Sequence, residues 1–383
     1  MKKLTKRRWR IQHFRRIVGA SVTLIGLVVI GVLTLRDQPV TIPVAIGIDL
    51  PLTPGAAIDP SDKNAADFYK EQNRSSPIEI YDSYNSPDPN QALNELEKAA
   101  DKGIRFFVNT QASSHAVQCL EFFASDQALS INVSATSTRL SDNDDYFLRI
   151  IPDLEIEQTF MASEVARLKG RRLLVLQDTG NLAYTQPALE VFRQQLRSSS
   201  TWQLHVHRMR YTDYQPRKLQ ALMQQPWDGL YILGGAYQPS IGNMVQQFYQ
   251  VNPKAPIVFT PWARSPAVLA NAGEAVHQVV QISPYLDASK DPTLERYLQS
   301  FKTRFGYEPH TMSFGTRQAL ELLDQAFAKG HRTPKAVKHY LLSKTVHNTS
   351  LGTIRFNRFG DNSCQFYAYS VTPTPAGSSP DKP

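Results

Sequence analysis

Short apolar or alternating runs recur along this chain between longer segments of helical period. The runs, each followed by polar or Gly-containing residues, cover residues 41–49, 78–81, 104–109, 129–134, 172–177, 202–208, 229–233, 256–260 and 276–282. The segments between them predict helices over 61–73, 89–102, 115–126, 155–169, 187–199, 216–225 and 240–249. This alternation is typical of parallel βα units, so the sequence predicts an α/β fold with parallel sheets.

The chain is too long for one compact core, and the βα series divides near residues 151–153, which predicts two similar lobes. After residue 283 the pattern changes to helices over 293–305, 311–329 and 334–343. Residues 353–357 and 365–371 are predicted to pair as an antiparallel hairpin around 358–361. The final residues, 373–383, are rich in Pro, Ser and Gly and are predicted to be a disordered tail.

The first 35 residues combine a basic stretch with an apolar run. Residues 1–16 hold eight Lys or Arg and no acid, and residues 17–35 hold no charge. As a helix, 17–35 spans roughly 28 Å, close to the hydrocarbon thickness of a bilayer. The positive-inside rule then predicts a single-pass inner-membrane anchor with a cytoplasmic N-terminus and a periplasmic or extracellular ectodomain. A cleaved signal peptide is the alternative, although no small-x-small site follows Leu35.

Charge and cysteine content narrow the class of protein further. Without the eight basic residues of the tail, 34 Lys and Arg face 34 Asp and Glu, so the ectodomain has no basic surface for nucleic acid. The only cysteines are Cys119 and Cys364, which excludes a lipid anchor directly after the apolar run. A single bridge between them and two unpaired thiols both stay open.

Hydroxyl side chains follow two neighbouring predicted strands. Ser113 and Ser114 come after the strand at 104–109, and Ser134 and Thr136 come at the end of the strand at 129–134. The carboxyl edge of a parallel sheet is the usual ligand crevice, and helix N-termini there favour anions. We therefore expect these four residues to bind a carboxylate or another small anion, with simple helix capping as the alternative.

The order and spacing of these features resemble the periplasmic leucine and branched-chain amino-acid binding family, the type I solute-binding fold. The resemblance covers nearly the whole ectodomain. It is most specific over 103–153, where Ala112-Ser113-Ser114 and Ser134-Ala135-Thr136 match the family's Ser-rich and Ala-Thr turns. Residues 149–153 resemble its link into the second lobe, 228–242 its Gly-Gly-Tyr turn, and 351–361 its closing hairpin.

This resemblance implies two Rossmann-like lobes joined by a three-strand hinge. Lobe 1 would comprise 40–152 plus 285–346, and lobe 2 would comprise 153–284 plus 347–372. It implies an ABC-transporter substrate-binding protein that closes over a small-molecule ligand and presents it to a permease. It also implies that Tyr184 and Tyr237 contribute ligand-binding walls from lobe 2, although both can instead be structural tyrosines.

One departure from the family concerns specificity. At 260–264 the family usually places a carboxylate for the ligand's ammonium group, and this chain has Trp262 there. A buried ammonium without a partner is unfavourable by several kcal/mol, so free α-amino acids are disfavoured unless Asp178 or a neighbour substitutes. Trp262 can cover a flat or apolar ligand and Arg264 can attract an anion, which favours carboxylates, aromatic compounds, amides or sugar-like molecules.

We expect no enzyme, no cofactor and no metal site. His115 begins a predicted helix beside Ser113 and Ser114, where it is poorly placed as their base, and no nucleophile elbow is present. His205 and His207 share a strand face without an identifiable third metal ligand. The remaining alternative is a ligand-sensing or ligand-free partner-binding ectodomain of the same fold.

Overall fold

A computed structural model describes residues 41–49, 60–86, 88–235 and 238–371. The predicted tail and anchor at 1–16 and 17–35, Tyr237 and the predicted tail at 373–383 lie outside these residues. Within the described ranges, no helix combines the length and the apolar character needed to cross a membrane.

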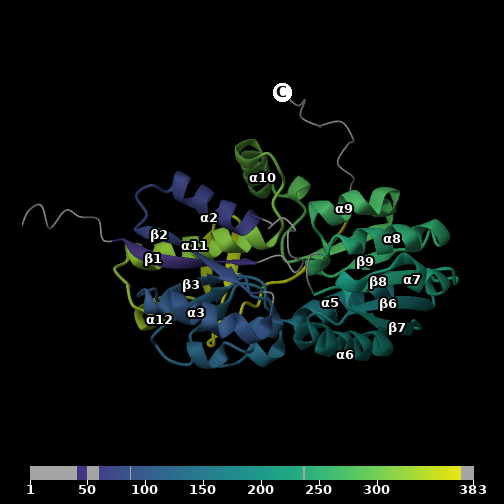
Figure 1. Cartoon of the computed structure of the whole chain (residues 1–383), viewed down its shortest axis with the longest axis horizontal. Coiled ribbons are helices and arrows are strands. Elements are labelled where there is room, and N and C mark those ends of the chain that lie inside the picture. The colour runs from purple at the N-terminus through teal and green to yellow at the C-terminus, as the bar shows by residue number, and fades with distance from the viewer. Residues whose placement is uncertain (1–40, 50–59, 87, 236–237, 372–383) are drawn as a thin grey trace, which may run out of the picture. The chain divides into compact units, whose positions relative to one another are not determined.

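The first sheet has five strands in the order β2-β1-β3-β4-β5. Its strands are β1 (Ile42–Asp49), β2 (Ile78–Asn85), β3 (Phe106–Asn109), β4 (Leu129–Asn132) and β5 (Phe147–Arg149). The pairs β1–β3, β3–β4 and β4–β5 are parallel. Helices α2 (Ser61–Gln72) and α11 (Met312–Ala328) lie on one face of this sheet and α3 (Ala92–Asp101) on the other (Figure 1). We call this sheet and its helices the first lobe.

Each face of the first sheet is closed by apolar packing. On the α3 face, Phe107 packs edge-on against Phe122 and Phe123. On the α11 face, the ring of Phe106 lies 5.0 Å from that of Phe327. Strands buried on both sides carry continuous apolar runs, which explains why the short runs of the sequence locate them well.

The second sheet has six strands in the order β13-β10-β9-β8-β6-β7. They are β6 (Arg172–Asp178), β7 (Gln203–Met209), β8 (Gly229–Leu233), β9 (Ile257–Phe259), β10 (Val279–Ser283) and β13 (Tyr367–Ser370). Helices α5 (Leu154–Arg167) and α6 (Leu182–Ser199) cover one face, and α7 (Pro216–Met223), α8 (Ser240–Val251) and α9 (Pro266–Ala272) cover the other (Figure 1). This sheet and its helices form the second lobe.

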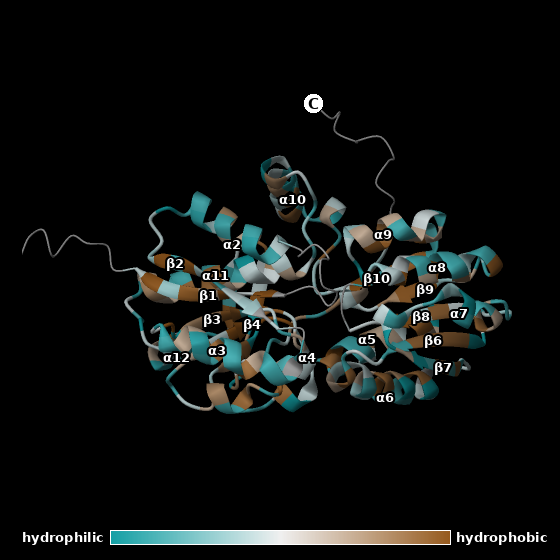
Figure 2. Cartoon of the chain, viewed as in Figure 1, coloured by the Kyte–Doolittle hydropathy of each residue, from teal (hydrophilic) through white to brown (hydrophobic). Residues whose placement is uncertain are grey.

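The inner strands of both sheets are hydrophobic while the helices expose hydrophilic residues (Figure 2). In the second lobe, β6 and β8 pack against α7, α8 and α9 through a core that includes Leu174, Ile232 and Phe248. Gly242 lets α8 and α9 approach closely, since a Cβ there would lie 2.3 Å from the carbonyl oxygen of Val268. The expected α/β class with parallel sheets is therefore confirmed.

The remaining elements lie between or beside the sheets. Helix α10 (Pro292–Phe305) packs on α2, and α12 (Pro334–Leu342) packs on α11. Strands β11 (Val346–Thr349) and β12 (Gly352–Arg355) form a separate antiparallel pair. The short helices are α4 (Ser113–Ala116), η1 (Pro89–Gln91), η2 (Leu120–Phe123), η3 (Thr138–Leu140), η4 (Tyr211–Asp213), η5 (Pro261–Ala263), η6 (Gly273–Gln278) and η7 (Ala288–Lys290).

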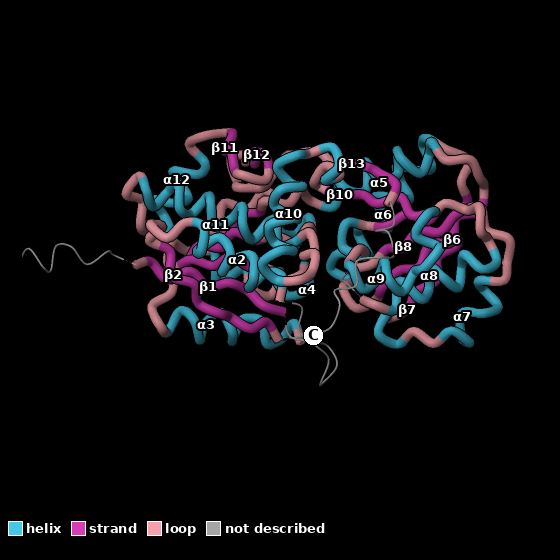
Figure 3. The backbone as a smooth tube through the Cα atoms, turned by 90° about the horizontal axis from the view of Figure 1, so that it is seen from above, coloured by secondary structure: helices cyan, strands magenta, loops and turns pink. Residues whose placement is uncertain are grey.

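The predicted hairpin of 353–357 with 365–371 is wrong. Residues of the first segment pair with β11, whereas β13 pairs antiparallel with β10 at the edge of the second sheet (Figure 3). A strand completes its hydrogen bonds with whichever edge the fold presents, and here that edge is distant in sequence. The chain does turn at 358–361, where the Asn357 N–H donates to the Asp361 carbonyl oxygen (2.9 Å) and the Ser363 N–H to that of Arg355 (3.0 Å), but this pairing ends before residue 365.

Three further differences concern local elements. The predicted helix at 115–126 is divided into α4 and η2, because Phe122 and Phe123 turn onto Phe107. Helix α6 begins at Leu182 and contains Pro187, which the sequence placed at the helix start. Strand β5 and helix α9 were not predicted.

Candidate functional site

The structure brings Ser113, Ser134 and Thr136 together at the carboxyl edge of the first sheet. The Ser113 hydroxyl oxygen accepts hydrogen bonds from the backbone N–H groups of Thr136 (3.2 Å) and Ser137 (3.1 Å). The Ser134 hydroxyl donates to the carbonyl oxygens of Thr110 (2.7 Å) and Gln111 (2.9 Å). These groups therefore stabilise the two turns, and ligand binding by the three residues stays a prediction.

Two buried asparagines that the sequence analysis missed shape the same edge. The side-chain oxygen of Asn132 accepts from the N–H groups of Ser134 (3.0 Å) and Ala135 (2.6 Å). The side-chain oxygen of Asn109 accepts from the N–H of Gln111 (2.7 Å). Each is the last residue of its strand. Asparagine at that position is a usable signal, because its side chain bonds the backbone two residues on.

Ser114 connects the two lobes. Its hydroxyl donates to the side-chain oxygen of Asn181 at 2.6 Å, and its backbone N–H contacts the same oxygen at 3.2 Å. The side-chain amide of Asn181 donates to the Gly235 carbonyl oxygen at 3.3 Å. A Cβ on Gly235 would lie 2.7 Å from the Cβ of Asn181, so this position needs glycine. The side-chain oxygen of Asn181 thus accepts from both Ser114 donors, which were predicted to bind an anion.

Tyr184 lies inside the second lobe. It is 1% exposed, and its hydroxyl donates to the Glu157 carboxylate. Gln158 donates to the same carboxylate oxygen at 2.7 Å and accepts from Tyr231 at 2.8 Å. Burial raises the pKa of Glu157 to about 7, although hydrogen bonds from Tyr184, Gln158 and Trp262 oppose that rise. Glu157 was not singled out in the sequence, where it looks like an ordinary acid in the first turn of a helix.

Trp262 lies in η5 directly after β9 and is 6% exposed. Its indole lowers the pKa of Glu157, as the Tyr184 hydroxyl does, so two of the predicted ligand-binding residues lie near one buried acid. The predicted contact of Trp262 with a ligand stays a prediction.

Asp178, the possible substitute for the missing acid, is already engaged by the backbone. Its carboxylate accepts from the N–H groups of Gly180 (2.9 Å) and Tyr211 (3.2 Å). Burial is the largest effect on its pKa and raises it. With these bonds in place, Asp178 is poorly suited to pair with a ligand ammonium group.

A crevice with a volume of about 760 Å³ is lined by residues from both lobes, including Arg264, which follows Trp262 by two residues. We call it the aromatic crevice. Its second-lobe side includes Arg264, Leu269 and Tyr369, and its first-lobe side includes His310 and Phe314. The segment after β10, with Tyr285, also lines it. Pockets of this size bury small organic ligands.

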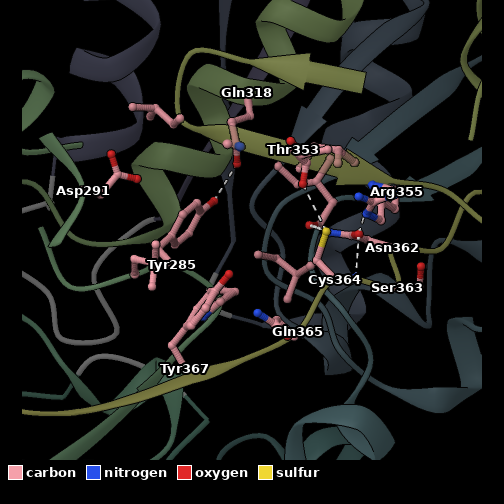
Figure 4. Close-up of a pocket in the computed structure, with 17 residues that line it drawn as sticks. Tyr285, Asp291, Gln318, Thr353, Arg355, Asn362, Ser363, Cys364, Gln365 and Tyr367 are labelled. Carbon is pink, nitrogen blue, oxygen red and sulfur yellow. Dashed lines mark hydrogen bonds between the residues drawn. The ribbon is translucent and has the colours of Figure 1, made fainter. Parts of the chain in front are cut away.

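A second cavity of about 490 Å³ lies where three connections between the lobes run side by side. Each connection contributes lining residues, among them Ile151, Tyr285 and Gln365. We call this space the hinge cavity. Tyr285, Tyr367 and Cys364 point into it, with the Tyr285 hydroxyl 2.8 Å from the Gln318 side-chain oxygen to which it donates (Figure 4).

Cys119 and Cys364 are both free. Cys119 is fully buried, and burial raises the pKa of its thiol to about 12. The Cys364 thiol lies 3.1 Å from the Thr353 carbonyl oxygen, to which it donates. The bridge that the composition left open is absent from the structure.

The described residues contain no cluster of three or more His, Cys, Asp or Glu side chains that can hold a metal ion. The ring of His205 instead packs 4.9 Å from that of Trp227.

Comparison with known families completes this picture. The family model described as periplasmic binding protein matches residues 43–377, most of the chain. The chain belongs to this family. The resemblance drawn from the sequence is therefore confirmed, together with the type I periplasmic binding fold.

Solved structures agree with this periplasmic binding protein in fold. A leucine-binding protein LivK from Thermotoga maritima has a TM-score of 0.74 at 17% identity, covering 86% of this chain and 95% of its own. A solute-binding protein of an ABC transporter from Rhodopseudomonas palustris BisB5, solved with 3,4-dihydroxybenzoic acid, has a TM-score of 0.74 at 15% identity, covering 87% and 94%. An R. palustris solute-binding protein in complex with benzoate has a TM-score of 0.72 at 11% identity, covering 87% and 93%. No curated protein sequence matches the chain.

Proposed function

We propose that this periplasmic binding protein is the extracytoplasmic solute-binding component of an ABC transporter. It captures a small polar or anionic solute between its lobes, closes about a hinge and presents the solute to an ABC permease. The observation that carries the proposal is the aromatic crevice, which residues from both lobes line. The chain's membership of the periplasmic binding protein family supports it. A ligand there contacts both lobes at once and so stabilises their closed arrangement.

The ligand in this proposal is a carboxylate without a free ammonium group. Trp262 replaces the usual acid, and Asp178 is occupied by backbone N–H groups. An ammonium group would therefore be desolvated without a charged partner. Structures of similar fold were solved with benzoate and 3,4-dihydroxybenzoic acid as well as with isoleucine. Those ligands define a suitable set of probes.

Lobe boundaries belong to the same proposal. Lobe 1 comprises 40–152 and 285–346, and lobe 2 comprises 153–284. The predicted assignment of all of 347–372 to lobe 2 does not fit the structure, because Gln318 of α11 donates to Thr349 and Arg149 of β5 donates to Asp361. The third connection therefore lies near Gln365. Three connecting segments form the hinge. Two free cysteines are compatible with closure, because no covalent bond joins Cys119 to Cys364.

The proposal also includes the membrane anchor. Residues 17–35 are apolar and long enough to cross the inner membrane, and the basic residues of 1–16 favour the cytoplasmic side. Tethering keeps the ligand-binding lobes at high effective concentration near a membrane permease.

A thermal-unfolding screen of the full chain in mild detergent tests the proposal. The probes are leucine, isoleucine, benzoate, 4-hydroxybenzoate, benzamide and glucose. A probe at 100 times its dissociation constant stabilises the protein by about 2.7 kcal/mol and raises the melting temperature. The effect should be retained in Ser198→Ala, a control on the exposed surface of α6. Its loss in Ser113→Ala, Thr136→Ala or Trp262→Ala would place the ligand at the strand ends predicted from the sequence rather than in the aromatic crevice.

A second candidate is a partner-binding ectodomain that has kept the fold without a ligand. The observation that favours it is the engagement of Ser113, Ser114 and Ser134 by groups of the chain itself. Stabilisation by none of the probes, in a folded protein, would contradict solute capture of these classes and support this candidate.

A further inference from the structure

Arg264 is the cation of the aromatic crevice that has no acidic partner. It follows Trp262 by two residues and is half-buried. Its Nη1 donates to the Tyr369 hydroxyl at 3.0 Å, and its guanidinium lies 5.9 Å from the centre of that ring. Among the residues that the structure describes, no carboxylate lies within ion-pairing distance of it. A guanidinium has five N–H donors, so most of its hydrogen-bonding capacity is available.

The other basic side chains of the crevice already lie near a carboxylate. Lys302 lies 3.4 Å from Glu308, and His310 lies 3.5 Å from Asp62. Asp287 is the remaining acid, and its carboxylate accepts from the Ser289 N–H at 2.9 Å. An anion entering the crevice therefore finds Arg264 as the cation that still lacks a counter-charge.

Aromatic side chains form the walls around this cation. Tyr285 and Phe314 meet edge to face with ring centres 5.2 Å apart. Tyr307 and Tyr369 line the same space. Its volume of about 760 Å³ accommodates a ring-bearing ligand, and aromatic walls favour an aromatic one.

The predicted anion site on the first lobe is occupied at the same time. Ser113 accepts from two N–H groups, the Ser134 hydroxyl donates to two carbonyl oxygens, and both donors of Ser114 face Asn181. The Ser113 and Thr136 hydroxyls can still donate to a carboxylate there, but both are neutral donors, whereas Arg264 supplies a positive charge together with its N–H groups. The charge of the guanidinium favours binding at Arg264.

We propose that the aromatic crevice binds an aromatic carboxylate whose charged group pairs with Arg264. This inference rests on the proposed solute-binding function and assigns the ligand class and the anion-binding residue. The carboxylate accepts two N–H bonds from the guanidinium fork, and the ring lies between Tyr285, Phe314 and Tyr369. Such bidentate pairs combine charge with fixed geometry, so lysine at this position should substitute only in part.

Isothermal titration of the full chain in mild detergent with 4-hydroxybenzoate and with neutral 4-hydroxybenzamide tests this assignment. Arg264→Gln should weaken 4-hydroxybenzoate binding at least about 30-fold, and Arg264→Lys should recover part of that loss. The amide should bind the wild-type chain more weakly than the acid and show little change in Arg264→Gln. Arg197→Gln removes the same charge from the exposed surface of α6 and is the matched control. Melting temperatures without ligand establish that each variant is folded.

The outcomes separate the two proposals. Tight binding of 4-hydroxybenzoate that survives Arg264→Gln and is lost in Ser113→Ala overturns the assignment of Arg264 and leaves solute capture intact. Leucine or isoleucine binding without any benzoate binding overturns the aromatic ligand class alone. No heat of binding with any of these probes overturns both.

Discussion

Arg149 is fully buried at the end of β5, and Asp361 compensates its charge. Its Nε donates to Asp361 at 2.9 Å, its Nη1 to the Ser137 carbonyl oxygen at 3.0 Å and its Nη2 to the Ser141 hydroxyl at 2.7 Å. This one side chain therefore fixes the turn after β4 and the segment after β12 to the end of the first sheet.

Removing the acid of this pair should be strongly destabilising. We expect Asp361→Asn to lower the free energy of unfolding by about 3–5 kcal/mol, because it leaves the Arg149 guanidinium buried with a neutral partner. Chemical denaturation of wild type and variant measures the difference. Glu71→Gln breaks the exposed pair with Arg304 and should change stability little. Equal effects of the two substitutions would contradict this role of Arg149.

Glu157 should make stability depend on pH. Its folded pKa, about 7, lies above its ordinary value of 4.5 because burial disfavours the charged form. The protonated form is therefore favoured by folding, and this stabilisation is complete below about pH 4.5 and lost as the pH rises through 7. The loss amounts to about 3 kcal/mol.

Glu157→Gln keeps the hydrogen bonds but cannot ionise. The unfolding free energy of the variant should therefore fall less than that of wild type between pH 5 and pH 8, a range that includes the Glu157 pKa of about 7. Asp145, whose pKa burial raises to about 6, changes in the same direction and is unaltered in both proteins. Comparing the two proteins isolates Glu157. Parallel pH profiles of unfolding free energy would show that Glu157 does not titrate in this range.

For single residues, the sequence predicted which side chains lie close together better than it predicted their hydrogen-bond partners. Ser113 and Thr136 meet as expected, since the carboxyl ends of adjacent parallel strands share an edge. Tyr184 is 1% exposed and bonded to Glu157, an acid that the sequence did not single out, and its contact with a ligand stays a prediction. Which way a side chain points depends on a helix from another part of the chain, and local pattern carries no information about it.

Among the elements, strands buried on both faces were predicted well and edge strands poorly. Strands β6, β8 and β9 each contain an uninterrupted apolar run, and each lies within two residues of its predicted position. The edge strand β13 pairs with β10 rather than within a local hairpin. Its partner is set by the assembly of the second sheet, so neighbouring sequence cannot identify it.

The contact between α4 and the N-terminus of α6 should influence how the lobes move. Asn181→Ala removes the hydrogen bonds from Ser114 and leaves the cores of both lobes unchanged. Nitroxide labels at Glu97→Cys on α3 and Arg197→Cys on α6, in a Cys364→Ala background, report the distance between lobes by pulsed electron paramagnetic resonance. Without ligand, Asn181→Ala should give longer and broader distances. Gln194→Ala, exposed on α6, is the control, and the same distances in both would contradict a latch at Asn181.

For the whole molecule, the fold class and family follow from the sequence, whereas the position of the ligand does not. The order of βα units specifies two parallel sheets, but a crevice such as that around Arg264 forms from α9, the segment after β10 and the start of α11. Residues so far apart in sequence are brought together only by the complete fold. In the proposed function, the two lobes close towards each other about the hinge when a solute binds between them.

The same labelled chain, titrated with 4-hydroxybenzoate, tests this claim most directly. We expect the distance distribution between α3 and α6 to become shorter and narrower as the ligand saturates the protein, because a bound carboxylate contacts both lobes. Benzamide at the same concentration should cause a smaller shift. An unchanged distribution under conditions where calorimetry shows saturation would contradict capture by hinge closure.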